Sequence, residues 1–298
     1  MRTDQRGAAI VMALLVVAVT TVVVSGAFLL QSAVAQQVEN AMAASQAKRL
    51  LEGAVDWVRV ILMEDARSTA TDHLGEAWAV SLEETRIDDE GDSPAWVSGA
   101  IEDAQSRFNL RNVAGESGPV ASEVAVLRRL LELVGEEPRF ADEIAIEVGG
   151  MQVVRPGSTQ AERVLPAVLD DIEANDPALR RALDRISPFV TLIPVASAIN
   201  VNTAPAEVLA ARLGNLSLVD ARRVVASRER APFRDLADVA VRIQGLDLGN
   251  ASGQLSVASQ FFLVNGIAEF RKVRVQATAL LKRQANAVEV VWVREVAA

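Results

Sequence analysis

The side chains that most often carry out catalysis are nearly absent from this chain. Its 298 residues include one histidine, His73, and neither cysteine nor tyrosine. Thiolate catalysis, disulfides and cysteine-ligated zinc or iron–sulfur centres are therefore excluded. His73 lies in a polar stretch with no suggested nucleophile or orienting partner, so we interpret it as a surface residue. Neither a Gly-x4-Gly-Lys-Ser/Thr loop nor a Gly-x-Gly-x-x-Gly motif is present, and we expect a protein that is not an enzyme.

The charge balance argues against nucleic-acid binding. The chain carries 39 acidic and 30 basic residues, for a net charge of −9, whereas nucleic-acid-binding surfaces are rich in lysine and arginine. Half of the residues are hydrophobic and 23% are charged, which is the composition of a folded protein. We therefore expect a folded, acidic protein without a nucleic-acid partner.

The apolar residues are concentrated near the N-terminus. Between Ala8 and Leu30 there are 23 residues, with polar side chains only at Thr20, Thr21 and Ser25. A helix of that length extends for about 35 Å, enough to cross a hydrocarbon core of about 30 Å. Arg2 and Arg6 precede the segment, so the positive-inside rule leaves the N-terminus in the cytoplasm. The sequence predicts a single-pass membrane protein whose residues after Leu30 lie outside the cytoplasm.

Three interpretations fit this N-terminal segment. A secretory signal peptide would explain the arginines, and Ala33-Val34-Ala35 offers a cleavage site, but signal peptides usually have an apolar core of about 7–15 residues. A plain membrane anchor is the second interpretation. The third rests on Arg6-Gly7 directly before Ala8, which is similar to the leader of type IV prepilins. That resemblance implies cleavage between Gly7 and Ala8 by prepilin peptidase, followed by N-methylation of Ala8.

The patterns that follow predict a fold with both helices and strands. An apolar stripe of Leu51, Val55, Val58 and Leu62 extends the first helix to about residue 64. Strands are predicted at residues 77–82, 96–101, 261–264, 273–279 and 288–293, with an acidic turn at 88–92 and further turns near Asn265-Gly266 and residues 283–286. The last three strands are expected to form an antiparallel meander. Helices are predicted between the two groups of strands, at residues 122–133, 163–175, 177–186, 206–213, 218–228 and 236–243.

Two segments stand out at the borders of the helical region. Phe108-Asn109-Leu110 is expected to form a turn with Phe108 and Leu110 buried. In Asn200-Val201-Asn202-Thr203-Ala204-Pro205, we expect Asn202 and Thr203 to cap a helix, with Pro205 in its first turn. Ser217-Leu218-Val219-Asp220 is typical of the start of a further helix.

The second segment also resembles helix-hairpin-helix modules, such as that of a membrane-anchored competence protein that binds DNA. Such a hairpin needs a Gly-x-Gly-like turn whose backbone amides meet a phosphate, and the turn here, residues 214–217, holds only Gly214. Residues 199–257 contain seven arginines and six acidic residues, for a charge of +1. That charge is low for a phosphate-binding surface. A competence-type DNA-binding protein is kept as the alternative function.

The order of these features resembles general secretion pathway protein K, the large minor pseudopilin of type II secretion. Most pilins and pseudopilins have glutamate as their fifth mature residue; protein K lacks it, and Met12 stands at that position here. The resemblance implies a protein that caps the pseudopilus tip, primes its assembly and supports export of folded proteins across the outer membrane. It implies partnership with proteins I and J, the major pseudopilin fibre and prepilin peptidase. It also implies an α+β fold, in which a long N-terminal helix packs on an antiparallel β-sheet with a large inserted all-α domain.

The resemblance also implies calcium binding, for which this chain has few matching residues. The corresponding stretch leaves Asp142, Glu147 and Glu162 as scattered carboxylates, without the dense aspartates of the family. Oxygen ligands of this kind suit Ca²⁺, but we interpret them as solvated acids.

Five domains are expected. Residues 1–7 are the leader, 8–30 the transmembrane helix, 31–111 the first pilin-like part, 112–257 the insert and 258–298 the last pilin-like part. The insert is expected to have two sterile-alpha-motif-like parts, at about 112–190 and 199–257.

Overall fold

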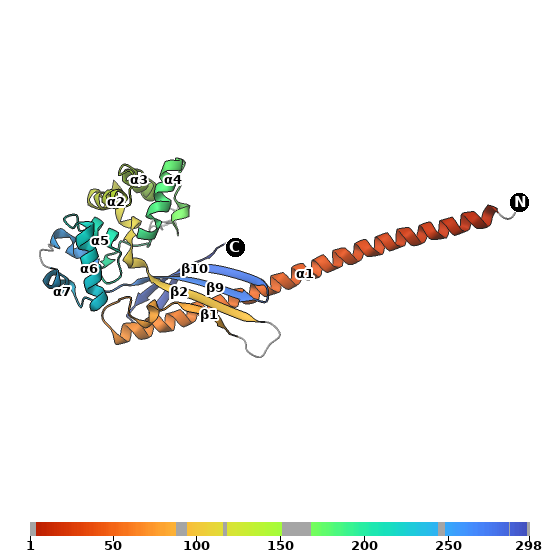
Figure 1. The fold of residues 1–298 in the computed structure, drawn as a ribbon, viewed down its shortest axis with the longest axis horizontal. Helices are drawn as coiled ribbons and strands as arrows, with labels where there is room; N and C mark the ends of the chain where they lie inside the picture. The colour runs from red at the N-terminus through yellow and green to blue at the C-terminus, as the bar shows by residue number, and fades with distance from the viewer. Residues whose placement is uncertain are drawn as a thin grey trace, which may run out of the picture.

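The computed structural model describes residues 4–87, 94–115, 118–150, 168–243, 248–285 and 287–296. The predicted acidic turn at 88–92 and the candidate ligand Glu162 lie outside these ranges. A long helix, a five-stranded sheet and a helical region make up the molecule (Figure 1). This mixed α+β architecture is the predicted fold class.

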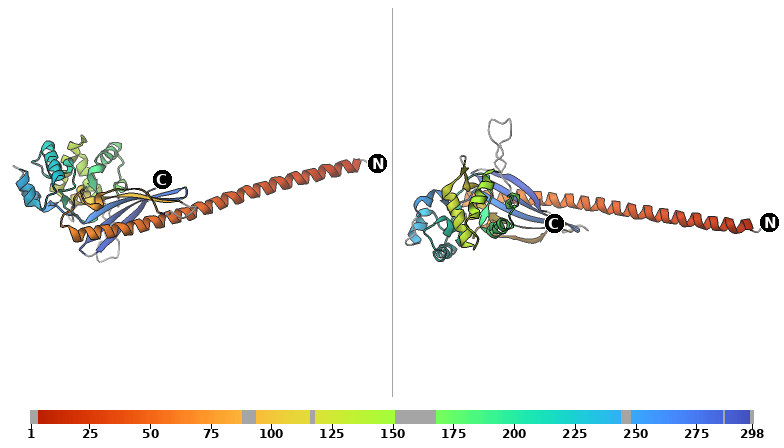
Figure 2. Two further views of the ribbon diagram at one scale, coloured as in Figure 1. Left: turned by 60° about the horizontal axis from the view of Figure 1, so that its bottom comes forward. Right: turned by 90° about the horizontal axis from the view of Figure 1, so that it is seen from above.

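Helix α1 is Asp4–Ser68 and organises the molecule. Its apolar N-terminal half projects away from the head, and its C-terminal half lies along one face of the sheet (Figure 2). Leu51, Val58 and Leu62 are buried there, and Val55 packs against the same core. The predicted long helix and its apolar stripe are therefore confirmed. From Ile10 onward the helix is long and apolar enough to cross a membrane.

The sheet has five antiparallel strands in the order β1-β2-β9-β10-β11. These strands are β1 (Leu82–Arg86), β2 (Ala95–Asp103), β9 (Phe261–Phe270), β10 (Val273–Gln284) and β11 (Ala287–Val296). The last three form the predicted meander. The helical region lies between β2 and β9 in sequence. It therefore starts and ends at neighbouring strands in the middle of the sheet.

Two predictions for the sheet region are wrong. Strand β9 does not turn at Asn265-Gly266 but continues to Phe270. Asn265 donates to Glu102 and accepts from Thr278 across the sheet, so its side chain serves strand pairing instead of a turn. Residues 77–79 form a short 3₁₀ helix and not a strand, because Trp78 turns into the core, where its ring packs edge-on against Phe262.

The helical region contains six α-helices among the described residues. They are α2 (Ala121–Leu133), α3 (Phe140–Gly150), α4 (Pro177–Ile186), α5 (Ala206–Arg212), α6 (Leu218–Arg230) and α7 (Leu236–Arg242). The described residues also form six short 3₁₀ helices. One precedes the sheet, η1 (Ala77–Ala79), and five lie between β2 and β9: η2 (Ala104–Ser106), η3 (Leu110–Val113), η4 (Leu169–Asp171), η5 (Ser187–Phe189) and η6 (Gly249–Gln254). Pairs of two-residue strands connect them: β3 (Phe108–Asn109) with β6 (Val190–Thr191), β4 (Ala114–Gly115) with β5 (Gly118–Pro119), and β7 (Ile199–Asn200) with β8 (Leu255–Ser256).

The structure corrects the sequence prediction at two helices. The described part of the predicted helix 163–175 holds only the short η4, since the Asp171 side chain bonds the Val168 amide and Arg294 of β11. Helix α3 was not predicted, although its buried residues share one face: Phe140, Ala141, Ile144, Ala145 and Val148. Acidic residues and a terminal Gly-Gly pair obscured that periodicity.

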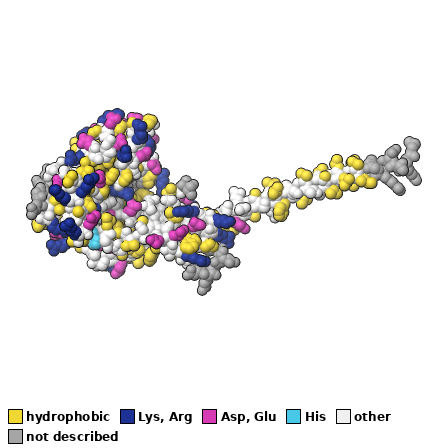
Figure 3. Space-filling model, in the orientation of Figure 1, with side chains coloured by type: hydrophobic (Ala, Val, Ile, Leu, Met, Phe, Trp, Pro, Cys, Tyr) yellow, Lys and Arg dark blue, Asp and Glu magenta, His cyan; other side chains and the backbone are white. Residues whose placement is uncertain are grey.

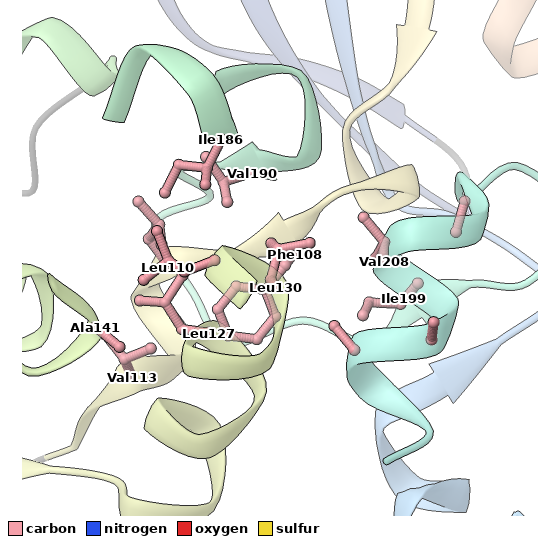
Figure 4. Close-up of a cluster of buried hydrophobic side chains, with 14 of the residues drawn as sticks. Phe108, Leu110, Val113, Leu127, Leu130, Ala141, Ile186, Val190, Ile199 and Val208 are labelled. Atoms are coloured by element: carbon pink, nitrogen blue, oxygen red, sulfur yellow. The ribbon is translucent and has the colours of Figure 1, made fainter. Parts of the chain in front are cut away.

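One hydrophobic core joins the helices of this region. Phe108 and Leu110, both fully buried as predicted, lie next to Leu127 and Leu130 of α2 (Figure 4). A buried ion pair adds a polar link between α2 and α5, because Arg212 donates to Glu123 at 2.8 and 2.6 Å. Helices from both predicted halves of the insert therefore share one interior.

Two glycines allow the sheet to pack closely. Gly99 of β2 pairs with Gly266 of β9, and a Cβ at Gly99 would lie 2.6 Å from the backbone oxygen of Asn265. At Gly266 a Cβ would meet Leu51 of α1 at 3.0 Å. The missing side chain at Gly99 permits the close pairing of β2 with β9, and the missing side chain at Gly266 permits the approach of α1 to the sheet.

Gly99→Ala should therefore destabilise the head by about 1–3 kcal/mol, because the backbone oxygen cannot rotate away from the new methyl group. Denaturant unfolding of the full-length chain in detergent measures the effect. Gly53→Ala on α1 is the matched control, since a Cβ there meets nothing within 4 Å. That change should be neutral or stabilise by up to about 1 kcal/mol. Equal stability of the two variants would contradict the close packing.

Candidate assembly helix and the polar junction of the insert

The projecting half of α1 presents an apolar surface to any neighbour (Figure 3). Met12 is 67% exposed on this surface. The hydroxyls of Thr20 and Thr21 donate to the backbone oxygens of Val16 and Val17 at 2.7 and 2.8 Å. Because these polar groups are satisfied within the helix, the surface suits lipid or other apolar helices. Gly7 and Ala8 belong to the first turns of α1.

The polar groups of the Asn200–Pro205 segment lie at the base of the helical region, where it meets the sheet. The Asn200 side chain is fully buried and donates, at 3.0 Å in each case, to three acceptors: the backbone oxygen of Asp72, the carboxylate of Asp103 and the hydroxyl of Ser259. The Thr203 hydroxyl donates to the same Asp103 carboxylate at 2.5 Å. One segment therefore connects the insert to the loop after α1 and to the end of β2.

The predicted capping role of Asn202 and Thr203 is wrong. Helix α5 starts at Ala206 after Pro205, without a side-chain cap. Asn202 instead exchanges hydrogen bonds with the backbone of Phe233, donating at 2.9 Å and accepting at 2.8 Å. It thus fixes the connection between α6 and α7. The predicted start of α6 is confirmed, because Ser217 accepts from the Asp220 amide at 3.1 Å.

Arg228 of α6 holds the same segment from the other side. Its guanidinium donates to the backbone oxygens of Val201, Ala204 and Thr203 at 2.6, 2.5 and 3.3 Å. Burial lowers the pKa of Arg228 to about 10. A buried cation that bonds three carbonyls fixes the course of this short backbone segment.

Two carboxyl groups bind one guanidinium beside this segment, and two more are buried next to them. Arg283 of β10 donates to Asp65 at 2.7 Å and to both oxygens of Asp72 at 2.5 and 2.6 Å. Oxygens of Asp65, Asp72 and Glu76 all lie within 4.8 Å of one another. Glu76 accepts from the indole of Trp78 and from the hydroxyl of Thr69, both at 2.8 Å. We call Asp65, Asp72, Glu76, Asp103 and Arg283, with Asn200, Thr203 and Ser259, the polar junction.

Burial raises the pKa of two acids in the polar junction. Desolvation, with Glu76 as the next contribution, raises the pKa of Asp65 to about 6. Desolvation also raises the pKa of Asp103, although hydroxyl and amide donors oppose the shift. The Asp103 carboxylate accepts from Thr203, Ser259, Asn200 and the Gln105 amide. None of these donors is a cation.

The two candidate calcium ligands that the structure describes, Asp142 and Glu147, do not come together. Asp142 and Glu147 are five residues apart on α3 and so point to different faces of the helix. Asp142 is exposed and pairs with Arg128 at 2.8 Å. His73 is partly buried and not a free surface residue, because its Nδ1 accepts from the Gly75 amide at 3.1 Å and it approaches Glu76. Asp72, Asp103 and Arg283 are far apart in the sequence and no local pattern connects them, so they could not be recognised as one cluster before the fold was known.

The fold is pilin-like: a long apolar N-terminal helix lies on an antiparallel sheet, and a helical region is inserted between two central strands. The family model for type II secretion system protein K matches residues 199–258. Type II secretion system protein K of Pseudomonas aeruginosa is 29% identical over 292 residues, covering 89% of this chain and 84% of the relative. The Klebsiella pneumoniae protein of the same name is 28% identical over 318 residues, covering 96% and 95%.

A solved structure shares the fold. The crystal structure of the GspK-GspI-GspJ complex from enterotoxigenic Escherichia coli contains a chain that this protein matches with a TM-score of 0.66 and 17% identity. The match covers 88% of this chain and 100% of that chain. Over nearly its whole length the chain is similar to type II secretion system protein K, and these matches support the function of a minor pseudopilin. The competence-type DNA-binding alternative has no support.

Proposed function

We propose that this minor pseudopilin caps the pseudopilus tip and primes its assembly together with the GspI and GspJ pseudopilins, for export of folded proteins. The solved relative is part of a GspK-GspI-GspJ complex, which supports these partners. Two features together support the tip position. The apolar helix α1 has methionine and not a carboxylate at position 12, and the large insert lies at the opposite end of the head (Figure 1). The protein acts as a structural component and not as an enzyme.

The membrane arrangement belongs to the same proposal. The apolar part of α1 spans the inner membrane once, with the N-terminus in the cytoplasm and the head in the periplasm. Prepilin peptidase cuts between Gly7 and Ala8, and Ala8 is N-methylated. The length and apolar character of α1 support a single span, and Arg2 and Arg6 support its orientation. Calcium binding by Asp142, Glu147 and Glu162 stays a prediction.

Met12 fits a subunit that has no neighbour above it. A glutamate in an apolar helix bundle is costly, by several kcal/mol, unless it is paired. In the fibre an ordinary subunit pairs its glutamate with a neighbour's amine, whereas a terminal subunit would leave it unpaired. Methionine at this position avoids that cost. The insert in turn obstructs the addition of a further subunit above the head.

Cysteine cross-linking tests the tip position, because the native chain contains no cysteine that would interfere. Gly53→Cys places a thiol on the solvent side of α1, and Ala226→Cys places one on the exposed face of α6. We expect Gly53→Cys to cross-link to other pseudopilins in assembled pseudopili, and Ala226→Cys not to. Cross-linking of Ala226→Cys to the major pseudopilin with the yield of Gly53→Cys would contradict a terminal position.

A division of the chain into domains follows from the same proposal. We assign residues 1–7 to the leader, 8–30 to the membrane helix, 31–111 and 258–298 to the pilin-like body and 112–257 to the insert. The end of β2 at Asp103 and the start of β9 at Phe261 support the last two borders. The shared core of α2 to α7 supports treating the insert as one unit.

A further inference from the structure

The polar junction collects charged groups from every part of the pilin-like body. Helix α1 contributes Asp65, the following loop contributes Asp72 and Glu76, and the strands contribute Asp103 and Arg283. His73 lies beside the junction, with its Nε2 3.9 Å from Glu76. All four carboxyl groups have an exposed fraction of 9% or less. Arg283 is bonded to only two of them. The junction therefore buries more negative charge than its one guanidinium can balance.

The insert reaches this junction with neutral groups alone. Asn200 and Thr203 both bind the Asp103 carboxylate, and Asn200 also binds the Asp72 backbone. At the C-terminal end of the insert, the Ser259 amide donates to the Asp72 carboxylate at 2.6 Å. The Ser259 hydroxyl donates to the Asp103 carboxylate at 2.7 Å. Both ends of the insert are thus attached through acids that lack a full set of cationic partners.

We propose that the attachment of the helical insert to the sheet is sensitive to pH, because its anchoring acids are buried around a single guanidinium. The attachment is tighter when the junction holds extra protons and looser when these acids are fully ionised. Ionised carboxylates in a buried site repel one another and are poorly solvated. A proton on one of them removes both costs and lets the acid donate a hydrogen bond to a neighbouring hydroxyl.

The direction of the pH effect follows from the two shifted acids. Burial raises the pKa of Asp65 from 3.8 to about 6, and it raises the pKa of Asp103 in the same direction. The folded junction therefore binds more protons than the open chain above pH 4. The stabilisation from these protons is fully present below the pKa that each acid has in the unfolded chain. It is lost as the pH rises through the higher pKa of the same acid in the folded protein. The contribution of Asp65 to the stability of the junction is therefore lost between about pH 4 and pH 6. The contribution of Asp103 is also lost as the pH rises above about 4, because its pKa is raised in the same direction.

Amide hydrogen exchange of the full-length chain in detergent micelles tests the proposal between pH 4.5 and 7.5. Exchange rates are corrected for the intrinsic pH dependence and followed in peptides that cover residues 199–205 and 256–260. We expect their protection to fall by at least tenfold over this range, because each lost proton contributes up to about tenfold per pH unit. Protection of α2, which lies within the insert, is expected to change by less than threefold.

Three variants assign the effect. Asp103→Asn and Asp65→Asn each remove one titrating group, and each should reduce the pH-dependent loss of protection. Asp184→Asn changes an exposed acid of α4 and should keep the native pH profile. If Asp103→Asn fails to fold, Asp65→Asn still decides the question. Protection that is independent of pH in the native chain would overturn the proposal, as would native pH profiles in both Asp65→Asn and Asp103→Asn.

Discussion

Replacing Arg283 with methionine should destabilise the head by about 3–5 kcal/mol at pH 7. Its guanidinium bonds both Asp65 and Asp72, and the side chains of all three residues are at most 10% exposed. Removing one partner of a buried ion pair leaves the other charges without compensation, and that is the more costly way to break such a pair. Denaturant unfolding of the full-length chain in detergent, followed by tryptophan fluorescence, measures the loss.

Two further variants separate charge from packing. Arg283→Lys keeps the charge but loses the fork that bonds two carboxylates, so a smaller loss of about 1–2 kcal/mol is expected. Arg274→Met changes an exposed arginine on the same strand and should alter stability by no more than about 0.5 kcal/mol. Arg283→Met should also be less harmful at pH 5 than at pH 7, because Asp65 can then take up a proton. Equal stabilities of Arg283→Met and Arg274→Met at pH 7 would show that the ion pairs do not hold the head together.

Gly7→Val should abolish processing of the leader and, with it, secretion through the assembled system. The proposed cleavage follows a residue without a side chain, and valine places a branched side chain directly at the cut. An uncut chain keeps its charged leader, so the N-terminus of α1 cannot enter the apolar helix bundle of a pseudopilus without burying Arg2, Asp4 and Arg6. Mass spectrometry of the purified chain should show a start at N-methylated Ala8 in the native protein and at residue 1 or 2 in Gly7→Val.

The matched control for this experiment lies in the same helix. A Cβ at Gly26 meets nothing within 4 Å, so Gly26→Val introduces the same side chain into α1 away from the leader. This variant should be processed normally. A mature native chain that begins near Gln36 would instead identify a secretory signal peptide. A native chain that keeps its first residues would identify a plain anchor.

Elements with a strong local pattern could be predicted from the sequence. Helix α4 starts at Pro177, where proline needs no amide partner and Asp176 accepts from the Ala178 amide at 2.8 Å. The apolar stripe of α1 and the Ser217 cap of α6 carried similar information. In each case the residues that determine the element lie within a few positions of one another, so the pattern survives without knowledge of the fold.

The errors arose where a tertiary contact overrides the local pattern. Asn265-Gly266 is a typical hairpin turn, yet Gly266 is required there by the approach of Leu51 from α1. Asn202 and Thr203 have the side chains of helix caps, but Phe233 and Asp103 offer them better-placed partners from distant segments. The polar junction itself could not be predicted, because Asp72, Asp103 and Arg283 are brought together only by the completed sheet.

The place of the insert in the sheet also determines the order in which the head can fold. Strands β9, β10 and β11 follow one another closely in the sequence, so they can pair through local contacts alone. The pairing of β2 with β9, in contrast, brings Asp103 next to Phe262 across a loop of about 160 residues. Closing so long a loop is entropically unfavourable, although the loss grows only slowly with length, and a folded insert shortens the effective loop by holding its own two ends together. The insert is therefore expected to fold before the centre of the sheet closes, which makes it an internal template for the pilin-like body.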